Sequence, residues 1–171
     1  MNKDTERLQK RIANSGYTSR RKAETLITEG KVKVNGTVET ELGTKVKPSD
    51  SIEVEGIKLE QEDKLYILFY KPSQVITSVS DDKDRKVVTD YFKQIKTRIY
   101  PVGRLDYDTS GLLLLTNDGE FTNLMTHPRY KIKKKYVVKL KGYLMREEVK
   151  ALEQGVNLED GKTQPATVKI K

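Results

Sequence analysis

The sequence predicts an α+β protein in which a small helix-pair-plus-hairpin domain precedes a larger domain with a mixed, mainly antiparallel sheet. Two observations support this fold class. The first sixty residues combine helical periodicity with one Asn-Gly turn between alternating valines, and the remainder alternates short β-favouring runs with short helical ones. The polar stretch KLEQEDK separates the two parts. We therefore expect a domain over residues 1–58, a linker over 59–64 and a second domain over 65–171.

Two helices are expected to open the first domain. Apolar residues four positions apart predict a helix over residues 5–14, which Ser15 and Gly16 end. Thr18 or Ser19 can cap a second helix, because their side-chain oxygens accept bonds from free N–H groups at a helix start. A glycine at position 30 is a typical helix end.

A hairpin is expected next, over residues 32–38 with the sequence VKVNGTV. Asn35 and Gly36 favour a type I′ turn, whose two central residues both need positive φ. The alternating segment SIEVE, residues 51–55, predicts one more strand.

The second domain begins with LYILFY, residues 65–70, a nearly continuous β-favouring run that predicts a strand buried on both faces. The other strands expected are 75–79, 99–102, 112–116, 136–140 and the final PATVKIK, and the helices are 87–92, 118–126 and 145–154.

Composition excludes several classes of protein. The 171 residues contain no cysteine, so disulfides, thiolate metal sites and cysteine nucleophiles are excluded. The chain has no apolar run of about 18 residues, as a membrane-spanning helix would need. Its first residues, MNKDTERLQK, are not a secretion signal. We expect a cytoplasmic protein that contacts no membrane.

The net charge of +8 favours a polyanionic partner such as RNA, DNA or anionic lipid, although a lysine-rich solvated surface would give the same total. The distribution of charge is more informative. Residues 1–22 hold seven basic side chains against Asp4 and Glu6, and residues 128–141 hold seven with no acid. Two basic blocks are typical of a nucleic-acid footprint.

The expected second helix starts with Arg20, Arg21 and Lys22. Cations are unfavourable at that end of a helix, where the backbone dipole attracts anions. A phosphate bound there would meet free N–H groups and three positive charges. The alternative is that exposed arginines at this position cost little.

The segment RLQKRIANSGYTSRRKAETLITEGKVKVNG resembles the S4-like RNA-binding domain, and the match extends over roughly residues 5–55. In that family a basic helix pair and the following hairpin dock on structured RNA. The resemblance implies that the RNA contacts are Arg7, Lys10, Arg11, Arg20, Arg21, Lys22 and Lys31.

Most catalytic patterns are missing from the second domain. It has neither GxGxxG nor GxxxxGK, no nucleophile elbow, and no paired metal-ligand spacing. The single histidine, His127, precedes a proline at an expected helix end and is better explained as a cap than as a catalyst.

The carboxylates of GRLDYDTSGLLLLTNDGE, residues 103–120, remain as candidates. This loop leads into a buried leucine strand, and strand ends are common places for functional sites. Arg104 and Asp106 are two residues apart and can pair on an extended loop. The pair could keep a nucleophilic carboxylate ionised or could serve only to fix the loop.

The same stretch, with the later THPRYKIKKKY and the earlier LYILFYKPSQVITS, resembles the catalytic signature of pseudouridine synthases of the RsuA/RluB family. An S4-like domain ahead of it fits that family too. The resemblance implies isomerisation of a uridine in ribosomal RNA, of the large or the small subunit, without metal or other cofactor. The N1–C1′ bond breaks, the uracil turns, and a C5–C1′ bond forms.

The resemblance also implies roles for individual residues. Asp106 matches the catalytic aspartate, and three points of attack stay open: C1′, C6 and the C2′ proton. Arg104 would pair with Asp106 or fill the space of the flipped nucleotide. Tyr136 matches a tyrosine that stacks on the target base, although alternation with Val138 also permits a core position. Arg129 and Lys135 would hold phosphates. We expect a monomer that acts on ribosomal RNA or a pre-ribosomal particle.

One element of the family is not found. Members carry a further basic segment with a Gly-Arg and Gln-Val-Arg-Arg type of motif, and nothing in residues 155–171 matches it. We therefore expect a fragment of a longer protein with an incomplete active site. The alternative functions are a non-catalytic RNA-binding or ribosome-associated protein and a glycosidase, which would need a second acid such as Asp108.

Overall fold

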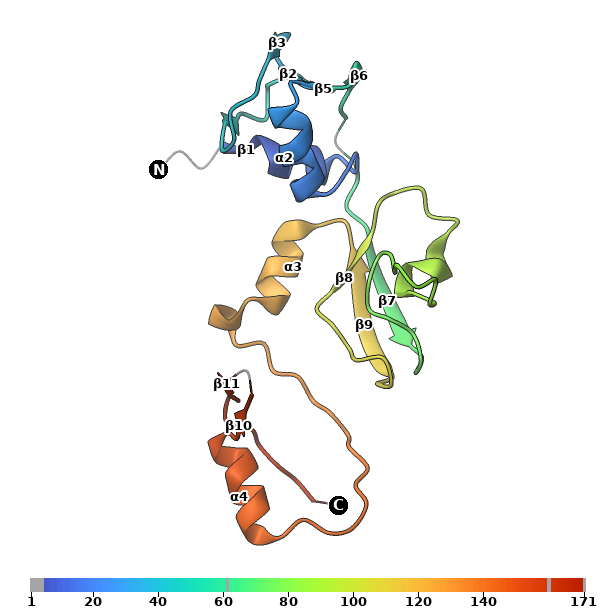
Figure 1. Cartoon of the computed structure of the whole chain (residues 1–171), viewed down its shortest axis with the longest axis vertical. Coiled ribbons are helices and arrows are strands. Elements are labelled where there is room, and N and C mark those ends of the chain that lie inside the picture. Colours follow the sequence, from blue (N-terminus) through green and yellow to red (C-terminus); the bar gives the residue numbers. More distant parts are fainter. Residues whose placement is uncertain (1–4, 61, 160, 171) are drawn as a thin grey trace. The chain divides into compact units, whose positions relative to one another are not determined.

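The computed structural model describes residues 5–60, 62–159 and 161–170. Figure 1 shows the order of the elements along the chain. Contacts between Cα atoms divide the chain into two compact units, one ending at Ile132 and the other beginning at Lys133. The domain boundaries expected near residues 58 and 64 remain a prediction. The α+β class is confirmed, and every strand pair in the described residues is antiparallel.

The expected helix pair is present as α1, Leu8–Asn14, and α2, Arg20–Thr28. The first helix begins later than predicted because the two-residue strand β1, Glu6–Arg7, pairs with β4, Lys45–Val46. The second begins where the sequence indicated, since the Ser19 side chain accepts a bond of 3.3 Å from the backbone N–H of Lys22.

The hairpin prediction is also confirmed. Strands β2, Val32–Val34, and β3, Thr37–Val38, pair around Asn35 and Gly36, whose φ angles are 52° and 84°. The predicted strand over 51–55 is β5, Ile52–Val54, and an unpredicted strand β6, Ile57–Lys58, completes a sheet of order β3-β2-β5-β6. Both helices contribute to one core with this sheet, made of Leu8, Ile12, Ala23, Leu26, Ile27, Val32, Val46, Ile52 and Val54.

The remainder of the first unit contains a second sheet, of order β7-β9-β8 (Figure 1). Its strands are β7, Tyr66–Lys71, β9, Gly111–Thr116, and β8, Tyr100–Val102. A short 3₁₀ helix, η1, spans Val88–Phe92. The core of this part is formed by the buried residues Val75, Val88, Ile99, Leu113 and Leu115.

The expectation that the run LYILFY is buried on both faces is wrong. Tyr66, Leu68 and Tyr70 are exposed, with Leu68 at 71%, whereas Ile67 and Phe69 pack against the core. Successive strand residues point to opposite faces, so one half of the run faces away from the core. Lys71 falls on the inward half and is completely buried.

Three further predicted strands are not formed in the described residues. Residues 75–79 contribute one isolated parallel bridge between Ile76 and Val87. Residues 136–140 and 165–170 have no strand partner there, and a strand needs a neighbour to satisfy its backbone groups. Lys171 lies outside the described residues. The second unit instead holds the predicted helix as α4, Arg146–Gln154, followed by the short pair β10, Asn157–Leu158, and β11, Gly161–Lys162.

The helix predicted over 118–126 is α3, Gly119–Thr126, with Asp118 as its N-cap. His127 follows and caps η2, Pro128–Tyr130, because its Nδ1 accepts a bond from the Arg129 backbone N–H, so the prediction of a capping histidine is confirmed. None of the helices in the described ranges is both long and apolar enough to cross a membrane.

Asp118 joins the linker, β7 and α3. Its carboxylate accepts bonds from the Glu120 and Phe121 backbone N–H groups, from the Tyr66 hydroxyl at 2.9 Å and from the Lys64 ammonium at 2.9 Å. Burial alone would raise the pKa of Asp118, but the bonds from Lys64, Phe121, Tyr66 and Glu120 lower it to about 2.

The Asp118→Asn variant should lose about 2 kcal/mol of unfolding free energy at pH 7, the equivalent of lowering a carboxyl pKa from 3.8 to about 2. Because the folded-state pKa is depressed, this stabilisation is complete above pH 3.8 and disappears as the pH falls towards 2. Urea titrations of both proteins across that range measure the difference. Asp63→Asn, on the exposed linker, is the control that should change nothing, and a wild-type-to-variant gap independent of pH would contradict the assignment.

Candidate active site

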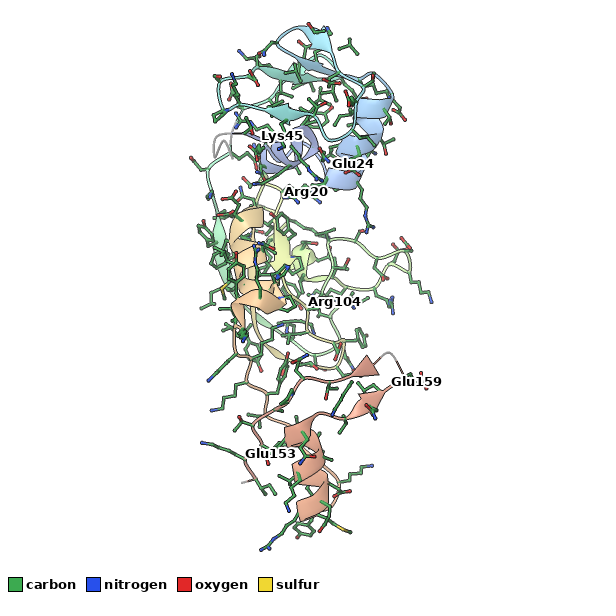
Figure 2. The ribbon with its side chains drawn as sticks, turned by 90° about the vertical axis from the view of Figure 1, so that its left-hand side faces the viewer. Arg20, Glu24, Lys45, Arg104, Glu153 and Glu159 are labelled. Atoms are coloured by element: carbon green, nitrogen blue, oxygen red, sulfur yellow. The ribbon has the colours of Figure 1, made fainter. Side chains whose placement is uncertain are left out.

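The candidate catalytic loop spans residues 103–110 and joins β8 to β9. Gly103 begins the loop and Gly111 follows it, with φ angles of 80° and 146°, values that favour glycine. The loop is anchored at both ends, because Val102 before it pairs with Leu114 and Gly111 after it pairs with Lys71 in antiparallel strands. Arg104 and Asp106 are both exposed on it, and Figure 2 labels Arg104.

Lys71, the last residue of β7, binds the backbone of this loop. Its side chain is completely buried, and its Nζ donates to the carbonyl oxygens of Pro72 at 3.0 Å, Tyr107 at 3.3 Å and Thr109 at 2.7 Å. An ammonium group has three donors, so all of them are used. Burial lowers the pKa of Lys71, and the negative charges of Asp106 and Asp108 act against that shift.

The segment after Lys71 fixes further backbone groups of the loop. The Thr77 hydroxyl donates to the Leu105 carbonyl at 2.6 Å and accepts from the Leu105 N–H at 3.2 Å. Ser73 donates to the Asp108 carbonyl at 3.1 Å, and the Gln74 N–H donates to the Tyr107 carbonyl at 2.7 Å. The backbone of the loop is therefore held by residues 71–77 on both sides of Asp106.

The Asp106 side chain has no hydrogen bond or ion pair within the described residues, and the same is true of Arg104. The Arg104–Asp106 ion pair expected from the sequence is therefore not formed in this structure. The chain turns directly after Asp106, whose carbonyl accepts from the Thr109 N–H at 3.0 Å, and no strand pairing keeps residues 104–106 extended. The backbone on both sides of Asp106 is thus fixed by hydrogen bonds, while the Asp106 carboxylate itself is exposed.

The other predicted site residues of the catalytic half lie elsewhere. Arg129 is exposed on η2, with its guanidinium 4.6 Å from the centre of the Tyr130 ring. Lys135 and Tyr136 are exposed and belong to the second unit, so their relation to Asp106 stays a prediction.

The predicted RNA contacts of the first domain divide into two groups. Three of them pair with carboxylates: Lys10 with Glu6 and Glu120, Arg11 with Glu6, and Lys31 with Glu29 and Glu55. The other four, which form no ion pair with any described carboxylate, are Arg7, Arg20, Arg21 and Lys22. The first turn of α2 accordingly exposes three cations and contains no acid.

Sequence reasoning did not find the residues that hold the loop, Lys71, Ser73 and Thr77. A signal for Lys71 did exist. A lysine at the inward position of an alternating strand, directly before a proline, is unusual because lysine is almost never fully buried without partners.

The candidate site therefore consists of the accessible Asp106 carboxylate, on the loop between β8 and β9, and the buried Lys71, which binds the backbone of that loop. The model of the RNA pseudouridylate synthase family matches residues 65–170, and the S4 domain model matches residues 6–52. The chain belongs to the RNA pseudouridylate synthase family and carries an S4 domain ahead of the catalytic region.

Named relatives agree with this placement. Ribosomal large subunit pseudouridine synthase B of Bacillus subtilis is 64% identical over 96% of this chain and 68% of its own length. An uncharacterized RNA pseudouridine synthase of Aquifex aeolicus is 45% identical over 96% of this chain and 67% of its own length. A crystal structure of a pseudouridylate synthase superposes with a TM-score of 0.58 at 26% identity, covering 96% of this chain and 72% of that one.

Replacement of Lys71 by methionine should leave the Pro72 and Thr109 carbonyl groups without their donor, while the Tyr107 carbonyl keeps its bond from the Gln74 N–H. We expect a loss of about 3 kcal/mol in unfolding free energy, since each buried unsatisfied polar group costs about 1–3 kcal/mol. Faster amide hydrogen exchange across residues 103–110 should accompany it. Lys83→Met, at an exposed loop position, is the matched control. Unchanged exchange in the catalytic loop of the Lys71 variant would show that Lys71 does not hold the loop.

Proposed function

We propose that this protein isomerises a uridine of large-subunit ribosomal RNA to pseudouridine, with Asp106 as the catalytic carboxylate. The observation that carries the proposal is the accessible Asp106 side chain on a loop whose backbone is fixed by Lys71 and Thr77. Its substrate is suggested by the relative named a ribosomal large subunit pseudouridine synthase, which is 64% identical over nearly the whole chain.

The reaction balances without a co-reactant. The N1–C1′ bond of uridine breaks, the uracil turns, a C5–C1′ bond forms, C5 loses its proton and N1 gains one. Asp106 would act on the nucleoside while Tyr136 stacks on the base and assists the transfer of the C5 proton. Arg104 would pair with the carboxylate once RNA is bound, or fill the space that the flipped nucleotide leaves. The target uridine must leave its stack to reach an exposed loop.

Binding of the RNA is assigned to the basic side chains on both domains. Arg7, Arg20, Arg21 and Lys22 are free of acidic partners in the described residues and accessible to phosphates, and the match to the S4 domain supports the same role. Arg129 and Lys135 would hold phosphates near the target. Contacts of this kind make affinity fall steeply with salt.

Two finer expectations belong to the same proposal. We propose that the protein acts as a monomer in the cytoplasm, on free ribosomal RNA or on a pre-ribosomal particle. The absence of cysteine from the sequence fits a reducing compartment, where disulfides contribute nothing.

The test compares pseudouridine formation by the wild type, Asp106→Asn and Asp108→Asn. Unmodified large- and small-subunit ribosomal RNA transcripts serve as substrates, and pseudouridines are mapped by chemical modification. Asp106→Asn should lower the rate by more than about a hundredfold, because it removes the group that attacks the nucleoside. Asp108→Asn should stay active, because the Asp108 carboxylate forms no hydrogen bond or ion pair within the described residues, and its carbonyl, which accepts from Ser73, is unchanged.

Other outcomes would favour the alternative functions. A wild type that binds RNA and forms no pseudouridine would indicate a binding protein. Equal losses in both variants would point to paired acids, as a glycosidase requires. Modification of the small-subunit transcript alone would refute the large-subunit assignment.

A further inference from the structure

A cleft of about 380 Å³ lies within the first unit, and none of the described residues that line it belongs to the catalytic loop. Its walls come from the end of α1, the start of α2, the residues leading into β8, and one side of α3. The side chains that matter for its chemistry are Asn14, Arg20, Arg98, Tyr100 and Asn123. No acidic residue lines it.

The two arginines come from different domains and have no acidic partner. Neither Arg20 nor Arg98 forms an ion pair with any carboxylate in the part of the chain that the structure describes. The nearby Asp118 and Glu120 are already paired, with Lys64 at 2.9 Å and with Lys10 at 2.7 Å. Among the described residues, the two guanidinium groups of the cleft therefore have no ion-pair partner of their own.

Tyr100 lines the cleft together with these two cations. Burial and, after it, the negative charge of Asp118 raise the pKa of its phenol, and the charges of Arg98 and Arg20 act in the opposite direction. Arg98 is 5.8 Å from the centre of the Tyr100 ring. A phenol hydroxyl beside two guanidinium groups offers donors suited to a phosphate.

The floor of the cleft is open because α3 begins with glycine. A Cβ atom at Gly119 would lie 3.4 Å from the Tyr100 hydroxyl oxygen and 3.7 Å from the Arg20 Nη2. Figure 2 labels Arg20 at the start of α2, on the side of the helix pair that faces α3. A side chain at position 119 would fill the space between these donors.

The cleft also lies close along the chain to the catalytic loop. Tyr100 begins β8, a strand of three residues, and Gly103 and Arg104 follow directly. At about 3.3 Å per residue, β8 is about 10 Å long. An RNA strand bound at Arg98 and Tyr100 would therefore reach the loop within a few nucleotides.

We propose that this cleft is a second phosphate-binding site for the RNA backbone, in which Arg98 and Arg20 bind one strand and link the S4 domain contacts to the catalytic loop. The inference rests on the proposed function and adds Arg98, Tyr100 and Asn123 to the RNA-binding surface. Arg20 belongs to both surfaces, which makes them continuous. The phosphodiester backbone is the favoured ligand because Arg20 and Arg98 line the cleft without an ion-pair partner among the described residues, and a guanidinium group suits the geometry of a phosphate.

The experiment measures binding of the chain to a large-subunit ribosomal RNA transcript at several salt concentrations. Arg98→Ala should weaken binding roughly tenfold at about 0.1 M salt, and the slope of log K against log[salt] should fall by about 0.7–0.9, the value for one lost phosphate contact. Arg98→Lys should keep most of the slope. Lys96→Ala removes the same charge two residues away, outside the cleft, and should leave the slope unchanged. Thermal unfolding of each variant verifies that it is folded.

The outcomes separate this inference from the proposed function. If the wild type binds RNA while Arg98→Ala behaves like Lys96→Ala, the cleft is not a phosphate site. If inorganic phosphate at millimolar concentration binds the cleft equally in the presence and absence of RNA, the RNA backbone is not its ligand. If Arg98→Ala shows the reduced slope but the wild type forms no pseudouridine, the cleft is a phosphate-binding site and the catalytic proposal is wrong. A wild type that does not bind RNA overturns both.

Discussion

The catalytic region depends on one buried ammonium group. Lys71 has no exposed surface, and its three donors reach three carbonyl oxygens, two of them on the loop that carries Asp106. Desolvating a cation is unfavourable, and only a full set of acceptors makes it tolerable. If the loop moved, the buried Lys71 ammonium would lose two of its three acceptors. This cost holds the backbone of the exposed loop in one conformation.

Strand β9 connects this fixed loop with the start of β7 and the end of the linker. Its first residue, Gly111, follows the catalytic loop, and its last, Thr116, donates to the Leu65 carbonyl at 2.6 Å. The next residue, Asn117, accepts from the Leu65 N–H and donates to the Asp63 carbonyl. The residues Thr116 and Asn117 thus fix the end of the linker, so that one strand connects the attachment of the S4 domain with the loop that carries Asp106.

Local signals predicted much of the fold. Ser19 at a helix start and Asn35-Gly36 in a hairpin need only their neighbours in sequence, and both predictions are confirmed. The contacts of Lys71 with Tyr107 and Thr109 join residues more than thirty positions apart, so no local pattern contains them. The Arg104–Asp106 pair failed for a related reason: its geometry depends on the turn after Asp106. Strands expected over 136–140 and 165–170 needed partners that local sequence does not specify.

Lys71 touches only main-chain oxygens of the loop. Every residue has a backbone carbonyl, so the bonds from Lys71 do not depend on which side chains occupy positions 107 and 109. Substitutions there can accumulate without loss of the backbone shape, whereas a change at position 71 alters it at once. The side chains at these two positions can thus change while the backbone that carries Asp106 keeps its conformation. The conformation of the loop is thereby independent of the identity of the side chains that it exposes at positions 107 and 109.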